Sequence, residues 1–193
     1  CHSLQPLPAY EVEERICDRD THQAHVLIGN RGCSSVDPDR TALFLLNNIL
    51  GGPGMNSLLN VSLREKHGLV YTVESNTFSY QDTGVWSVYF GCEETKVDKC
   101  KRLVMNELRS LCDTPLSPQR LAMAKKQLIG QILIAGDNFE SYALALGKTY
   151  AINGRHRDVE AICNRIRSIS ADDLLAMARR VFDPERLTVL IYK

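Results

Sequence analysis

The segment from Gly52 to Tyr71 places the strongest constraint on how this chain folds. It has the pattern of a glycine-rich turn, a helix with one apolar side, a glycine that ends the helix, and the start of a strand. At about 100° per residue, Arg64 falls opposite the middle of the apolar stripe. That stripe consists of Met55, Leu58, Leu59 and Leu63. We therefore expect a helix over residues 54–66 with Arg64 pointing away from the core.

Length and charge set the broad class of the protein. The chain has 193 residues, 44% of them hydrophobic, which is enough for one well-filled core, so we expect a single domain over residues 1–193. Lys plus Arg and Asp plus Glu number 23 each, so no net charge attracts polyanions. No apolar stretch reaches the ~18 residues that span a bilayer, and residues 1–10 lack a signal layout. We expect no nucleic-acid partner and no membrane association.

The seven cysteines, at positions 1, 17, 33, 92, 100, 112 and 163, form no C-x-x-C pair. Their odd number also argues against a fully paired disulfide framework. We interpret each as a buried structural cysteine, because none lies in a local pattern that would lower its thiol pKa. A reducing compartment fits this use of cysteine, and we expect a cytoplasmic protein.

The hydrophobic period changes along the chain from strands to helices, to a hairpin, to helices again and to a last strand. Two short stretches at the beginning, residues 10–18 and 23–29, have the pattern of an antiparallel pair. Residues 70–80 and 85–92 predict a hairpin, and residues 187–192 predict the last strand. The order indicates an α+β fold, a mainly antiparallel sheet covered by helices on one face.

Capping residues locate the helices. Asp37 and Pro38 predict an N-cap and first turn for a helix that Gly51 ends. Thr95 with Asp98 resembles a capping box, as does Ser170 with Asp173, and Ser117 with Pro118 begins a long helix. The helices expected after the hairpin run from about 95 to 111, 118 to 135, 139 to 153, 158 to 167 and 171 to 182.

The chain contains none of the common sequence motifs of a catalytic centre. None of the five histidines begins an H-x-x-E-H or H-E-x-x-H sequence, so this chain by itself builds no such zinc site. There is no G-x-S-x-G. The run Gly51-Gly52-Pro53-Gly54 lacks the lysine and hydroxyl of a phosphate-binding loop, which favours a loop that only begins a helix.

Arg64 and Tyr71 are the candidate functional residues. On the pattern alone Arg64 is a solvated helix residue. Tyr71 alternates with Leu69 and Val73, which favours a ring that faces the core.

Residues 50–73 resemble the non-metal, C-terminal domain of pitrilysin/insulinase-type inverzincin zinc peptidases, the mitochondrial processing peptidase-like family. The shared form is a glycine-rich turn, Met, Ser, Leu, then Arg-Glu-Lys-x-Gly-Leu-x-Tyr, in which Arg64 and Tyr71 match the family's arginine and tyrosine. Weaker matches follow at residues 80–84, 116–128 and 139–141. The glycine-rich loop is short compared with that of the processing peptidase's regulatory subunit. The resemblance implies the metalloprotease LuxS/processing-peptidase-like α/β roll.

The resemblance also implies a function. Arg64 and Tyr71 would bind peptide substrate across a closed chamber, and the Tyr71 hydroxyl would act in catalysis as a donor to the substrate carbonyl oxygen. This chain would hold no cofactor. Zinc would lie in the partner, a zinc-bearing N-terminal domain or separate subunit with H-x-x-E-H. Two alternatives stay open: a non-catalytic scaffold or assembly subunit of the same fold, and an unrelated α+β ligand-binding domain.

Overall fold

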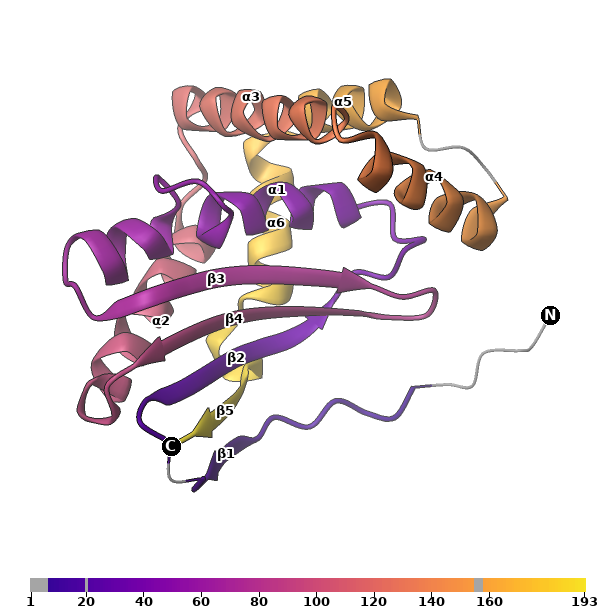
Figure 1. Cartoon of the computed structure of the whole chain (residues 1–193). Coiled ribbons are helices and arrows are strands. Elements are labelled where there is room, and N and C mark those ends of the chain that lie inside the picture. Colours follow the sequence, from indigo (N-terminus) through magenta and orange to yellow (C-terminus); the bar gives the residue numbers. More distant parts are fainter. Residues whose placement is uncertain (1–6, 20, 155–157) are drawn as a thin grey trace.

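A five-stranded sheet forms the base of the molecule in a computed structural model of the chain (Figure 1). The structure describes residues 7–19, 21–154 and 158–193, so Cys1 and His156 lie outside the described residues. The strands follow the order β1-β5-β2-β4-β3, and all neighbours are antiparallel except β1 and β5. Their bounds are β1 Glu14–Cys17, β2 Ala24–Gly32, β3 Val70–Ser79, β4 Gly84–Cys92 and β5 Thr188–Tyr192.

Helices lie over one face of this sheet. Figure 1 shows α1, α2 and α6 next to the strands, with α3 and α5 lying over α1 and α4 continuing beyond the end of α3. Their bounds are α1 Arg40–Gly51, α2 Val97–Asp113, α3 Pro118–Ala135, α4 Phe139–Asn153, α5 Val159–Ser168 and α6 Ala171–Val181. The predicted fold class, a mainly antiparallel sheet with helices on one face, is confirmed. None of the helices in the described ranges combines the length and apolar character that crossing a bilayer needs.

The pleat of the central strands separates the two faces. On β2, residues 24, 26, 28 and 30 are buried beneath the helices, while the residues between them are half-buried or exposed. On β4, Trp86, Val88 and Phe90 are buried in the same way, although Ser87 between them is buried as well. An antiparallel sheet with one covered face is expected to show this pattern. The core therefore sits between β2, β4 and the inner helices.

The predicted pairing of the first two strands is wrong. Both strands form, but β1 pairs in parallel with β5, and β5 lies between β1 and β2. β2 pairs with β4 on its other side. The strand that separates the two comes from the far end of the chain, so the local pattern of residues 10–29 contains no trace of it.

Of the four capping pairs predicted for helix starts, two are confirmed and two are wrong. Ser117 accepts a hydrogen bond from the Arg120 backbone nitrogen, and Ser170 and Asp173 form a complete capping box. Thr95 makes no cap, because a short 3₁₀ turn, η2 (Glu94–Lys96), precedes α2 and places Lys96 at its N-cap. Similarly, α1 begins only at Arg40, after Asp37 and Pro38.

Asp37 has a different role, in tying the entry of α1 to α6. Its carboxylate accepts a hydrogen bond from the Asp39 backbone nitrogen at 2.8 Å and one from Arg180 Nη2 at 2.6 Å. Partial burial opposes ionisation, but these two hydrogen bonds outweigh it and lower the pKa of Asp37 below its ordinary value. The Asp37 side chain is 12% exposed and that of Arg180 is 50% exposed, so solvent screens the pair in part.

We expect Asp37→Asn to lower the free energy of unfolding by about 1 kcal/mol near pH 7, because Asn keeps the bond to Asp39 but loses the charge. A lowered folded-state pKa means that the stabilisation is present above the unfolded-state pKa of about 4 and disappears as pH falls through the folded-state value. Urea unfolding from pH 7 down to pH 3 measures this. Asp39→Asn is the control, since Asp39 lies 3.9 Å from Arg165 with both side chains exposed. A penalty that does not change with pH would contradict the ionic explanation.

Candidate functional site

The candidate site begins in a π-helix, η1 (Asn60–Glu65), that precedes β3. Its hydrogen bonds skip one more residue than those of an α-helix, as in Lys66 N to Val61 O at 3.0 Å. Leu59 and Leu63 are buried, and Arg64 points outward as predicted. The predicted bounds are wrong, since helical structure begins only at residue 58 and Met55 is 64% exposed. Gly52, Pro53 and Gly54 are poor helix formers and leave the first part of this segment as a loop.

A glycine turns the chain from η1 into β3. Gly68 has a φ of 56°, in the left-handed region that glycine adopts without strain. The next backbone nitrogen, of Leu69, donates to Leu63 O at 3.0 Å, which satisfies a carbonyl at the helix end. The strand therefore starts at Val70, beside the end of the helix.

A β-bulge then turns Tyr71 outward. Val70 pairs with Cys92, but the next aligned pair is Val73 with Phe90, so Tyr71 and Thr72 together oppose the single residue between. Val70 and Val73 are both buried, and Tyr71 is 86% exposed. The core-facing ring that simple alternation favoured is wrong, because the extra residue breaks the period of two.

The helix end and the bulge bring the two predicted site residues together. Arg64 Cζ lies 6.0 Å from the centroid of the Tyr71 ring, a distance at which a guanidinium and an aromatic ring attract each other. The Arg64 Nε is 3.9 Å from Glu65 Oε1, at the outer limit of an ion pair. The guanidinium and the phenol are exposed side by side, and both are hydrogen-bond donors.

A buried polar network holds β3, the strand that carries Tyr71, against α1. Asn47 Nδ2 donates to Ser75 O at 2.9 Å, and Ser75 Oγ donates to Asn47 Oδ1 at 2.6 Å. The Trp86 Nε1 donates to the same Ser75 Oγ at 3.0 Å. Close contact at Gly51 adds to this, since a Cβ there would lie 2.8 Å from both Cβ and N of Ser75. The strand that carries Tyr71 is thus fixed to the helix layer.

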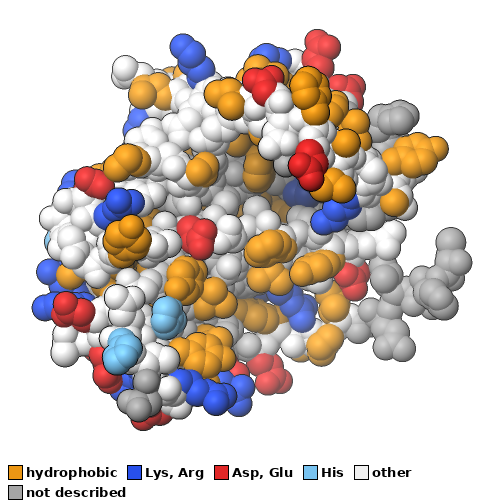
Figure 2. All heavy atoms as spheres, in the orientation of Figure 1, with side chains coloured by type: hydrophobic (Ala, Val, Ile, Leu, Met, Phe, Trp, Pro, Cys, Tyr) orange, Lys and Arg blue, Asp and Glu red, His pale blue; other side chains and the backbone are white. Residues whose placement is uncertain are grey.

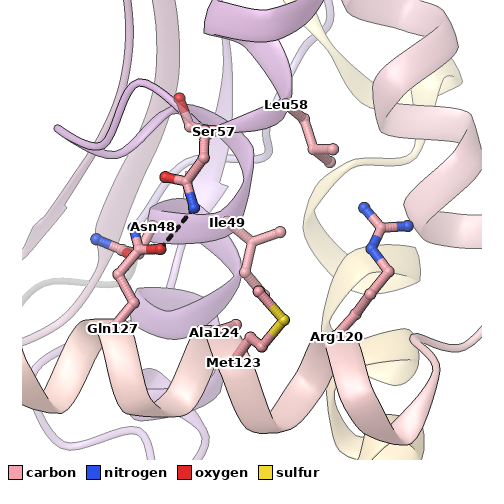
Figure 3. A pocket seen from close by; sticks show the side chains of 9 residues that line it. Asn48, Ile49, Ser57, Leu58, Arg120, Met123, Ala124 and Gln127 are labelled. Atoms are coloured by element: carbon pink, nitrogen blue, oxygen red, sulfur yellow. Dashed lines mark hydrogen bonds between the residues drawn. The ribbon is translucent and has the colours of Figure 1, made fainter.

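The glycine-rich loop borders a hollow that sequence reasoning missed. Figure 3 shows this hollow between α1, the loop and α3, with Asn48, Ser57, Leu58, Arg120 and Gln127 around it. Its volume is about 210 Å³, and Asn56 Nδ2 donates to Gln127 Oε1 at 2.8 Å across one side. The run of glycines predicted a loop at this place and no hollow beside it. The helix-forming pattern of α3 gave no sign that Arg120 and Gln127 line a hollow.

The described residues do not fit a metal ion. Within residues 7–19, 21–154 and 158–193, no three or more His, Cys, Asp and Glu side chains gather as metal ligands. The prediction that every cysteine is buried is confirmed for Cys33, Cys92, Cys100 and Cys163 and is wrong for Cys17 and Cys112, which are half-buried. Burial, with the charge of Asp37, raises the pKa of Cys33 to about 11.

Two of these thiols interact with each other. A hydrogen bond with Cys100, together with burial, raises the pKa of Cys92, and the same hydrogen bond lowers that of Cys100. Cys100 is fully buried, so its thiol does not reach a substrate.

The family is decided by sequence comparison. A model of the family described as "Peptidase M16 inactive domain" matches residues 2–128, about two thirds of the chain. The chain belongs to this family. The zinc-peptidase relationship predicted from residues 50–73 is confirmed, and an unrelated ligand-binding domain is excluded.

Two relatives of this chain are zinc proteases by name. The chain is 34% identical over 163 residues to an uncharacterized zinc protease of Streptomyces coelicolor, covering 84% of the chain and 35% of that protein. It is 27% identical over 184 residues to an uncharacterized zinc protease of Bacillus subtilis, covering 95% and 45%. The chain thus spans less than half the length of these curated relatives.

Solved structures confirm the fold. A peptidase M16 inactive domain from Pseudomonas fluorescens aligns with a TM-score of 0.79 and 20% identity over 97% of this chain and 44% of its own. A protease from Helicobacter pylori aligns with a TM-score of 0.83 and 19% identity, covering 93% and 44%. A chain in complex III2 of Candida albicans aligns with a TM-score of 0.81 and 17% identity, covering 94% and 46%.

Proposed function

We propose that this chain is the non-metal half of a zinc-dependent endopeptidase, which closes the chamber and binds peptide opposite a zinc-bearing half. The exposed Arg64–Tyr71 pair carries the proposal, because an aromatic ring that is 86% exposed gains nothing from the core of its own chain. A bulge that places the ring beside a guanidinium suits binding of a partner or substrate.

The two side chains have complementary tasks on a peptide. The Arg64 guanidinium donates to backbone carbonyl oxygens and stays charged at every relevant pH. The Tyr71 hydroxyl donates to a carbonyl oxygen that gains negative charge as the peptide bond is hydrolysed. Zinc, when bound in the other half, supplies the activation of water. Six free thiols in the described residues fit a reducing compartment such as the cytoplasm.

The first test separates the two halves. We expect the complete protein to contain about one zinc ion and to cut an unstructured peptide, and residues 1–193 alone to bind no stoichiometric zinc and to cut nothing. Zinc analysis and a fluorogenic peptide assay on both preparations measure this. Stoichiometric zinc with turnover from residues 1–193 alone would refute the proposal. Zinc-free, inactive complete protein would instead favour the scaffold alternative.

A further inference from the structure

The outer surface of α4 differs from that of α2. Of its 15 residues only Glu140 and Lys148 are charged. By contrast, the exposed side of α2 is polar throughout, at positions 98, 99, 102, 106, 109 and 110. A surface helix normally carries polar residues on its solvent side.

Burial along α4 shows which of its sides is uncovered. The half-buried residues Tyr142, Ala145, Leu146 and Thr149 recur at helical spacing and mark its inner side. The other side includes Phe139, 82% exposed, and Leu144, 70% exposed, together with the two charged residues of the helix, which are exposed as well. Figure 2 shows hydrophobic side chains gathered at the upper right, where α4 lies in Figure 1. At the end of α3, Leu133 lines a hollow together with Tyr142 and Ala145 of the inner side of α4, so it does not belong to this outer surface.

Gly147 is a second, independent indication that one side of α4 is uncovered. It lies in the middle of α4, and a Cβ built on it meets no described atom within 4 Å. Glycine is the least favourable helix residue after proline, and nothing in the described chain requires it here. Ala143 and Ala151, one turn to either side, are exposed as well. Three small residues on one exposed side permit the backbone of another element to approach closely.

We propose that the outer face of α4, made of Phe139, Ala143, Leu144, Gly147 and Ala151, packs against the zinc-bearing half of the protein, with one of its elements crossing at Gly147. This inference rests on the proposed function for the identity of the occupant. The relatives supply the argument for it, since this chain covers 35% to 45% of their length and more than half of each lies outside it.

A substitution at Gly147 changes the Tm in opposite directions, depending on whether the outer face of α4 is covered by the zinc-bearing half or faces solvent. In the complete protein we expect Gly147→Leu to lower the Tm by roughly 3 °C or more, because the side chain separates the two halves. If α4 faced only solvent, the same substitution would raise the Tm, since leucine is the better helix former. Leu144→Gln provides a second variant, which lowers the Tm only if Leu144 is covered.

The control adds the same bulk to a polar surface. Asn106→Leu lies on the exposed side of α2, and its Tm should stay within roughly 1 °C of the parent protein. Hydrogen exchange supplies the second readout: amides of α4 should exchange about tenfold faster in Gly147→Leu than in the parent complete protein. A raised Tm with unchanged exchange would overturn the inference. If zinc and turnover are present at the same time, the proposed function survives that result.

Discussion

Tyr71→Phe should lower the kcat of the complete enzyme by about 100-fold with little change in KM. The substitution removes one hydroxyl and keeps the ring beside Arg64, so the loss reports the donor alone. A donor aimed at the oxygen that becomes negative in the transition state contributes roughly 10²- to 10³-fold to kcat. Steady-state hydrolysis of a fluorogenic peptide by parent and variant enzyme measures the effect.

Tyr80→Phe is the matched control for this experiment. Tyr80 follows the other end of β3 and is 56% exposed, so it undergoes the same chemical change on the same hairpin. Its kcat should match that of the parent enzyme. If Tyr71→Phe also kept the parent kcat, the catalytic role of Tyr71 would be lost, and a raised KM alone would leave it a substrate-binding residue.

Much of the fold follows from local signals in the sequence. Caps at Ser117 and Ser170 fix the starts of α3 and α6, and the glycine at 51 marks the last residue of α1. What the sequence could not predict is the position of β1, because its partner β5 is more than 170 residues away. Local pattern identifies a strand, whereas its neighbours depend on how the whole chain is arranged.

The candidate site was also predicted from the sequence only in part. Residue identity and resemblance pointed to Arg64 and Tyr71, but the alternation of Leu69, Tyr71 and Val73 predicted a buried ring. One extra residue in β3 turns the ring outward instead. The residue types at positions 71 and 72 do not predict a bulge. The sequence pattern does not predict the π-helix either. A single extra residue in a helical turn leaves the apolar residues near the places expected for an α-helix.

Trp86 packs between the sheet that carries the site and the helix layer, and it stabilises the contact between them. It is fully buried, its ring centroid lies 4.4 Å from that of Phe182, and its indole nitrogen donates to Ser75 Oγ at 3.0 Å. Phe182 follows α6 and Ser75 lies on β3, so this one side chain joins the sheet to the helix layer. Removing it leaves a cavity between elements that are already fixed by other contacts, which limits their collapse.

Trp86→Ala should therefore lower the free energy of unfolding by about 3–5 kcal/mol, a large share of the stability of an ordinary domain. Trp86→Phe keeps most of the volume and loses the hydrogen bond to Ser75, so we expect a much smaller loss than for alanine. Urea unfolding monitored by circular dichroism compares both with Phe78→Ala, which removes an aromatic ring that is 56% exposed and should cost under about 1 kcal/mol. Equal losses for Trp86→Ala and Phe78→Ala would show that the contact between β4 and Phe182 does not hold the helix layer to the sheet.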